Sequence, residues 1–112
     1  MLAAEIWLVR FPFSDLASTK VRPALVLATH REELIIVGIF SKISNRNLQE
    51  AWGLIKEDHP EFSLTGLKKT SLIRADKIAT IARSVLQRKL DILPSYLLIL
   101  VQNALKKALN IP

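Results

Sequence analysis

The chain has 112 residues, half of them hydrophobic, with a formal net charge of +6 and no cysteine. This length predicts one domain over residues 1–112, and a domain so small often needs a second copy to cover its surface. The lack of cysteine excludes disulfides and thiolate chemistry, which suits the reducing cytoplasm. We expect no export signal, because residues 1–5 have no basic region ahead of an apolar stretch. The longest apolar-rich stretch, residues 96–101, is too short to span a membrane.

Positive charge is concentrated in the second half of the chain. Residues 1–61 hold 7 Lys/Arg and 8 Asp/Glu, a net charge of −1, whereas residues 62–112 hold 9 Lys/Arg and 2 Asp/Glu, a net charge of +7. A basic half of this kind indicates a polyanionic partner, most commonly nucleic acid. A solvated, lysine-rich face explains the same charge equally well.

The first half of the chain alternates short apolar segments with polar connections. Segments rich in β-branched and aromatic residues predict strands over residues 5–11, 22–29, 34–41 and 52–55. The run over 34–41 is continuously apolar, so we expect it to be buried on both faces. These connections contain Pro, Ser, Asn and Asp, which favour turns.

The second half predicts one long strand followed by two helices. Residues 70–81 read as extended, with Leu72, Arg74, Asp76 and Ile78 on one side, so Arg74 and Asp76 project together at a Cα separation of about 6–7 Å. A short helix over residues 84–90 has Ser84 as its cap, and a second begins near Pro94 with apolar residues at helical spacing. We therefore expect a mainly β (α+β) fold, a small barrel of about five to seven strands with a C-terminal helix and a short preceding helix.

Motifs for metal and cofactor binding are missing from the sequence. His30 and His59 are the only histidines, and no HExxH, CxxC or DxDxD spacing is present, so we expect no metal, although either histidine remains available as a proton carrier. The three glycines form neither GxGxxG nor a P-loop, and no GxSxG motif occurs. We therefore expect no cofactor.

What remains is a set of Arg, Ser and Asp side chains at strand ends. Arg22 opens a predicted strand, Ser41 closes another, and Arg74 and Asp76 share a strand face. Guanidinium and hydroxyl groups are suited to binding phosphate. The alternative is structural: Arg22 as a solvated strand start, and Arg74–Asp76 as a surface ion pair that contributes little.

Three segments together resemble the MazF/PemK family of toxins. They are AEIWLVRFPF at residues 4–13, RPALVL at 22–27 and SLIRADKIATI at 71–81. The resemblance spans essentially the whole chain and implies an SH3-like barrel, a homodimer and sequence-selective, metal-independent cleavage of single-stranded RNA such as mRNA. It also implies a cognate antitoxin whose acidic, partly disordered tail complements the basic charge.

The family's catalytic residues fall on four positions of this sequence. Arg22 matches the catalytic arginine and Ser41 the catalytic Thr/Ser, while Arg74 and Asp76 match an Arg-x-Asp pair with acid–base roles in some members. The family usually has glycine where Ala4 stands. The loop before Arg22 also lacks a histidine that some members carry, and a small polar pair is replaced by Phe-Ser at 40–41.

The resemblance implies a reaction in which the RNA 2′-hydroxyl attacks its own phosphate. We expect 2′,3′-cyclic phosphate and 5′-hydroxyl products, with Arg22 and Ser41 stabilising the phosphoryl charge and Asp76 as base, kept ionised by Arg74. The residues expected to bind RNA are Phe13, Lys20, Lys42 and Arg46. Two alternatives remain open: a barrel that binds nucleic acid or antitoxin without cutting, and a purely structural subunit.

Overall fold

The computed structural model describes residues 3–10, 21–40 and 52–112. Its six strands form one antiparallel sheet in the order β4-β5-β3-β2-β1-β6. The strands are β1 (Glu5–Arg10), β2 (Val21–His30), β3 (Glu33–Phe40), β4 (Trp52–Ile55), β5 (Ser71–Ala82) and β6 (Leu86–Ile92). The helical elements are the 3-10 turns η1 (Phe62–Thr65) and η2 (Arg83–Val85) and the helix α1 (Ser95–Ala108).

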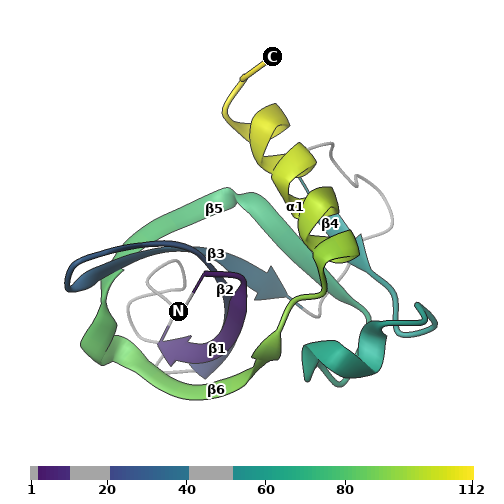
Figure 1. Cartoon of the computed structure of the whole chain (residues 1–112), viewed down its shortest axis with the longest axis horizontal. Helices are drawn as coiled ribbons and strands as arrows, with labels where there is room; N and C mark the ends of the chain where they lie inside the picture. Colours follow the sequence, from purple (N-terminus) through teal and green to yellow (C-terminus); the bar gives the residue numbers. More distant parts are fainter. Residues whose placement is uncertain (1–2, 11–20, 41–51) are drawn as a thin grey trace.

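The sheet curls strongly because a very short link joins two strands that are far apart in it. In the strand order, β5 and β6 are separated by β3, β2 and β1, yet only η2 connects them along the chain. Three residues span about 10 Å at most, so the sheet must bend to bring these strand ends together. Figure 1 shows β5 and β6 sweeping around the other strands. The predicted barrel-like, mainly β fold is confirmed, although β4 and β6 remain as edges of the sheet.

The predicted short helix over residues 84–90 is wrong. Only Arg83–Val85 are helical, and Leu86–Ile92 form strand β6, which pairs with β1 through Trp7↔Lys89 and Leu8↔Arg88. Leu86 and Leu90 are four residues apart, which imitates one face of a helix in the sequence. Pairing with β1 fixes the segment as a strand, and only the folded chain provides that partner.

Strand β5 contains a large irregularity next to the predicted Arg-x-Asp pair. Its register with β3 passes from Val37↔Ile78 directly to Gly38↔Arg74, so the three residues between Arg74 and Ile78 have no partner on β3. This interruption ends the simple alternation of side chains along the strand. Ile78 consequently packs against the same cluster as Ile73, and its predicted position on the Arg74 side is wrong.

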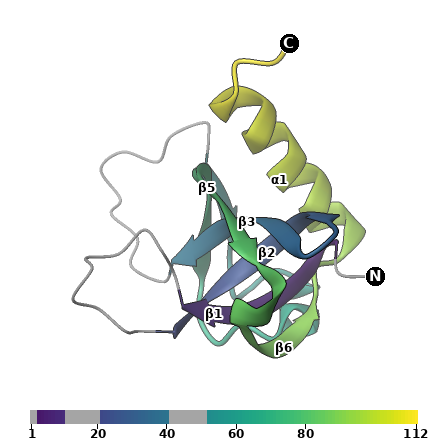
Figure 2. The ribbon, with the colours of Figure 1, turned by 90° about the vertical axis from the view of Figure 1, so that its left-hand side faces the viewer.

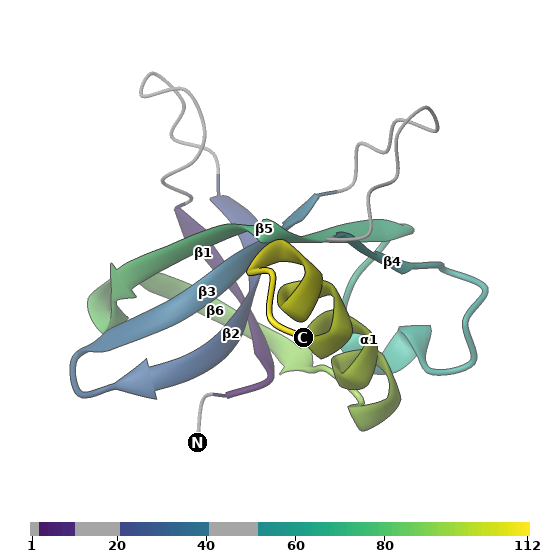
Figure 3. The same cartoon turned by 90° about the horizontal axis from the view of Figure 1, so that it is seen from above.

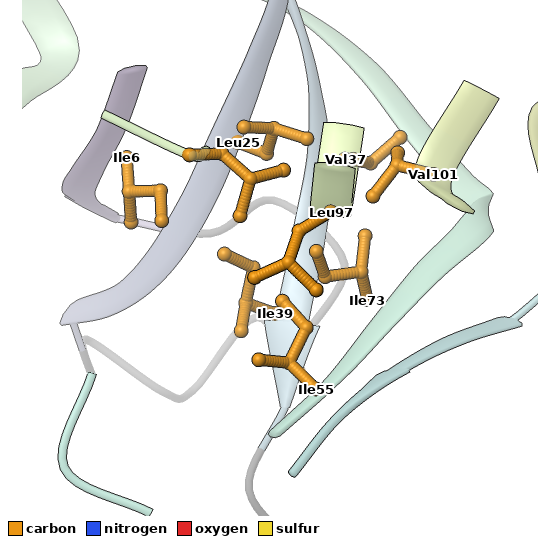
Figure 4. Close-up of a cluster of buried hydrophobic side chains, with 9 residues drawn as sticks. Ile6, Leu25, Val37, Ile39, Ile55, Ile73, Leu97 and Val101 are labelled. Atoms are coloured by element: carbon orange, nitrogen blue, oxygen red, sulfur yellow. The ribbon is translucent and has the colours of Figure 1, made fainter. Parts of the chain in front are cut away.

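Helix α1 covers one side of the curled sheet and completes the main hydrophobic core. It lies beside β4 and β5, and Figure 2 shows it running along one flank of the sheet to the C-terminus. Leu97 and Val101, one turn apart, are buried against Ile39 and Ile73 of the central strands (Figure 4). The predicted helix near Pro94 is therefore confirmed, with its first residue at Ser95.

A second buried cluster lies among the strands, and β3 contributes to both clusters. Leu34 and Ile36 belong to the second cluster, whereas Val37 and Ile39 belong to the first. The expected burial of this strand on both faces is thus confirmed. No helix in the described part of the chain is both long and apolar enough to cross a membrane.

The C-terminal end of α1 has a well-defined cap. Asn110 adopts a left-handed conformation (φ 57°), and its amide donates to the carbonyl of Lys107 at 3.3 Å. The amide of Ile111 donates to the carbonyl of Lys106 at 2.8 Å. These two bonds form a Schellman motif, in which Asn tolerates the left-handed position better than most residues.

Candidate functional site

Arg22 lies at the end of the sheet where β2 begins and β3 finishes. It is half-buried and pairs with Val9 of β1. Its guanidinium carbon is 5.9 Å from the centroid of the Phe40 ring on β3, within the range of a cation–π contact. This contact holds the guanidinium beside the last residue of β3. Ser41, the next residue in the sequence, lies outside the described residues, so its meeting with Arg22 stays a prediction.

Arg74 and Asp76 form a bidentate ion pair. Arg74 donates through Nε to Oδ1 of Asp76 at 3.1 Å and through Nη2 to Oδ2 at 2.6 Å. The prediction that these two side chains project together is confirmed. Their side chains are 28% and 33% exposed, so the pair contributes little to stability. The two-point geometry instead fixes the guanidinium in one orientation.

The register of the sheet relates Arg22 to this ion pair. Gly38 of β3 is paired with Ala24 on one side and with Arg74 on the other. Residues directly opposite one another project from the same face of a sheet, as do residues two apart on one strand. Arg22 and Arg74 therefore belong to the same face, on the two strands that flank the end of β3. Figure 3 shows the start of β2 and the end of β3 on the same side of β5.

A cavity of about 420 Å³ adjoins Arg22. Four of its lining residues are cationic and none is acidic, and the remaining ones are mostly aliphatic. The lining consists of Leu8, Arg22, Pro23, Ile39, Gly66, Leu67, Lys68, Lys69, Ser71, Arg88 and Leu90. Arg74 and Asp76 do not line it, so the structure groups Arg22 with two sets of residues: the ion pair on β5 and the basic cavity.

Hydroxyl side chains fix the backbone of the segment that carries Lys68 and Lys69. Thr65 is fully buried; its hydroxyl donates to the carbonyl of Phe62 at 2.7 Å and accepts from the amide of Leu67 at 3.1 Å. After the two lysines, the hydroxyl of Ser71 donates to the carbonyl of Lys69 at 2.8 Å. The segment therefore has defined hydrogen bonds at both ends, which limits its freedom.

Lys68, Lys69 and Arg88 line the cavity but were not predicted from the sequence. Their only signal was the excess positive charge of the second half of the chain, which could not be assigned to a place. The four residues predicted to bind RNA all lie outside the described residues: Phe13, Lys20, Lys42 and Arg46. Across residues 3–10, 21–40 and 52–112, no group of three or more His, Cys, Asp or Glu side chains is placed to hold a metal ion.

Solved structures with the same fold include toxins and endoribonucleases. One is an endoribonuclease in complex with its cognate antitoxin from mycobacterial species, with TM-score 0.74, 18% identity and coverage of 100% of this chain and 97% of that chain. Another is the Mycobacterium tuberculosis toxin MazF-mt6, with TM-score 0.73, 16% identity and coverage of 96% and 98%. A third is a MazE–MazF structure from Deinococcus radiodurans, with TM-score 0.69, 19% identity and coverage of 99% and 96%.

These likenesses show that the chain shares the fold of the solved structures, and the family follows from the sequence match. The model of the PemK-like, MazF-like toxins of type II toxin–antitoxin systems matches residues 3–109. The chain belongs to this family, as the resemblance predicted. A comparison with curated protein sequences gives no match.

Proposed function

We propose that this protein is a metal-independent endoribonuclease that cleaves single-stranded RNA as the toxin of a type II toxin–antitoxin system. The observation that carries the proposal is the grouping of Arg22 with the Arg74–Asp76 pair on one face, at the end of β3. Two guanidinium groups on strands that flank one strand end can hold a phosphate between them. Family membership supports the same activity.

Arg22 is proposed to stabilise the negative charge that develops on the phosphoryl oxygens. A guanidinium is a planar fork of donors that remains charged at neutral pH, which suits two oxygens of one phosphate. Because Phe40 holds this group at 5.9 Å, little reorganisation is needed when the charge develops. The hydroxyl of Ser41 would add a further donor.

Asp76 is the proposed base for the 2′-hydroxyl, and Arg74 positions it. Both carboxylate oxygens of Asp76 already accept hydrogen bonds from Arg74. The ion pair favours the ionised carboxylate, the form needed to accept a proton. It also opposes proton uptake, so we expect the pair to loosen when RNA phosphate competes for the Arg74 guanidinium.

The RNA strand would supply its own nucleophile in this reaction. The 2′-oxygen bonds to the adjacent phosphorus as its proton passes to Asp76, and the bond from phosphorus to the 5′-oxygen breaks as that oxygen takes a proton from water. Asp76 then returns its proton to the solvent, so no net proton is gained or lost. The products are a 2′,3′-cyclic phosphate and a 5′-hydroxyl end. DNA lacks the 2′-hydroxyl, so it resists this cleavage.

Arg22→Ala tests the proposal. We expect the purified variant to keep its circular dichroism spectrum and to lose cleavage of a single-stranded RNA pool by about 10²-fold or more, the size of one lost oxyanion donor. Arg22→Lys retains the charge without the fork and should recover only part of the rate. Adding a chelator should leave the wild-type rate intact. A wild-type rate in Arg22→Ala, or inhibition by the chelator, would contradict the proposed chemistry.

The main rival is a module of the same fold that binds RNA or antitoxin without cutting. Wild-type protein that retains RNA on a filter but generates no 5′-hydroxyl ends would favour this rival. A structural role without RNA contact predicts binding that is indifferent to salt, because phosphate contacts weaken steeply as salt rises.

We also propose a homodimer, a cytoplasmic location and an acidic antitoxin as partner. The net charge of +7 over residues 62–112 complements an acidic chain. Related structures are complexes with a cognate antitoxin or with MazE. If a short acidic protein is encoded beside this chain, its co-expression should relieve growth inhibition by this protein.

A further inference from the structure

The cavity beside Arg22 combines two kinds of lining. Lys68, Lys69 and Arg88 supply positive charge from the segment after η1 and from β6, in addition to Arg22 of β2. Five aliphatic or proline side chains supply an apolar wall: Leu8, Pro23, Ile39, Leu67 and Leu90. A volume of about 420 Å³ falls in the range of pockets that enclose a small organic ligand. The lining therefore suits a molecule that is anionic at one end and apolar at the other.

The three added cations have no acidic partner among the described residues. The ion pairs in this part of the structure join other groups, Arg74 with Asp76 and Lys89 with Glu5. Lys89 follows Arg88 in the sequence but forms an ion pair with Glu5 of β1, whereas Arg88 lines the cavity. The cavity thus retains its positive charge within residues 3–10, 21–40 and 52–112.

The segment carrying the lysines is packed closely against the opposite wall. Gly66 has a left-handed backbone (φ 74°), and a Cβ added there would lie 3.1 Å from the Cβ of Leu90 and 3.1 Å from its carbonyl oxygen. Only glycine fits this conformation and this close approach without strain. Together with the hydroxyl bonds of Thr65 and Ser71, this contact fixes the backbone that carries Lys68 and Lys69 beside the cavity.

We infer that this cavity is a subsite for one nucleotide of the RNA strand, next to the phosphate that is cleaved. Lys68, Lys69 and Arg88 bind the phosphate of that nucleotide, and the base lies against the wall that includes Leu8 and Leu90. The inference rests on the proposed function, since Arg22 belongs both to the cavity and to the cleavage site. The three cations are binding residues for the neighbouring nucleotide and take no part in the chemical step.

A nucleotide matches the cavity better than a bare anion does. Inorganic phosphate would use the cations but leave the apolar wall in contact with water. An unstacked base of single-stranded RNA presents a flat, weakly polar face, and proteins commonly bind such bases in pockets. An acidic peptide with an aliphatic side chain is the competing ligand, and the binding experiment below separates the two.

The binding test uses the four ribonucleoside 5′-monophosphates and the intact protein. Titrations followed by amide and methyl NMR should give saturable shifts at Gly66 and at the methyl groups of Leu8 and Leu90. Inorganic phosphate should shift the Gly66 amide alone. Nucleotides that leave these methyl groups unshifted at 10 mM (about the weakest binding worth testing) would overturn the inference. So would an acidic, leucine-containing peptide that shifts them when nucleotides do not.

A charge-matched pair of double variants tests the role of the lysines. Lys68→Gln/Lys69→Gln removes two charges from the cavity, and Lys106→Gln/Lys107→Gln removes two from the last turn of α1. Binding of a random single-stranded RNA pool with 2′-O-methyl riboses, which cannot be cleaved, is measured against salt. We expect about tenfold weaker binding for the cavity variant, a salt slope lower by about 0.7 per lost contact, and less than twofold change for the α1 variant. Equal weakening of both variants would overturn the inference.

Cleavage kinetics separate failure of this inference from failure of the proposed function. If the function and the subsite are both correct, the cavity variant raises KM on unmodified RNA with kcat nearly unchanged. If the cavity variant cleaves RNA with the kcat and KM of the wild type, the inferred subsite is wrong and the proposed function is unaffected. If the protein binds nucleotides in the cavity but cleaves no RNA, the proposed activity is wrong and the nucleotide-binding site is supported.

Discussion

Ala4 occupies a backbone conformation that favours glycine, which leads to a specific stability prediction. Its φ is 70°, in the left-handed region. Two hydrogen bonds hold it there: its amide donates to the carbonyl of Val26 at 2.8 Å, and its carbonyl accepts from the amide of Leu93 at 2.8 Å. The residue thus links β2 to the chain that follows β6, and it cannot relax without losing one of these bonds.

Ala4→Gly should therefore stabilise the protein. A left-handed conformation costs an L-residue about 1–2 kcal/mol, and glycine loses about 0.5–1 kcal/mol more backbone entropy on folding than alanine. The difference predicts a net gain of about 0.5–1 kcal/mol. For a domain of this size, that gain corresponds to a rise in Tm of about 2–4 °C.

The measurement is thermal unfolding by circular dichroism at one fixed protein concentration, because any oligomer makes Tm depend on concentration. Ala82→Gly is the matched control: Ala82 is an exposed residue at the end of β5 with a φ of −70°, so this substitution should lower the free energy of unfolding by about 0.4–1 kcal/mol. Opposite signs for the two variants are expected. Equal destabilisation by both substitutions would refute the reasoning about the strained backbone at Ala4.

Four further substitutions test the packing and the turns. Leu97 is 1% exposed, so Leu97→Ala should lower the free energy of unfolding in urea by about 2–5 kcal/mol. Ile99 is 57% exposed, so Ile99→Ala should lower it much less. Similar decreases for the two variants would contradict the assigned face of α1. Gly66→Ala forces a side chain against Leu90 and should cost about 1–3 kcal/mol of stability with weaker RNA binding, and a neutral result would refute the close approach. Arg31→Gly relieves a left-handed φ of 57° in the β2–β3 turn and should raise Tm; a lower Tm would count against the assigned turn.

The sequence was informative where residue spacing alone defines an element. The continuous apolar run of β3 predicted a strand buried on both faces, and its residues indeed enter both core clusters. The 3.6-residue spacing of apolar side chains predicted α1, and proline before it marked its start. The two-residue spacing of Arg74 and Asp76 predicted that their side chains would meet, which the bidentate pair confirms.

Other features depend on partners that only the folded chain supplies. Residues 86–92 have helix-like spacing, but the free edge of β1 makes them a strand. The break in the register of β5 carries Ile78 to the other side, because the strand must bend to follow the curled sheet. No local pattern in the sequence predicts either the strand over residues 86–92 or the break in the register of β5.

The residues of the candidate site also fall into two groups, those that the sequence predicts and those that only the fold brings together. Arg22, Arg74 and Asp76 could be singled out from the sequence, because short motifs carry their identity and spacing. The basic cavity could not, since Lys68 and Lys69 come from one segment and Arg88 from another, and three further strands, β1, β2 and β3, contribute to its apolar wall. The sequence by itself determined that the segments of β1 to β5 are extended, where α1 lies and which guanidinium groups are candidates for the site. The tertiary structure alone decided the curl of the sheet and the meeting of distant cations around one cavity, because both depend on contacts between residues far apart in the chain.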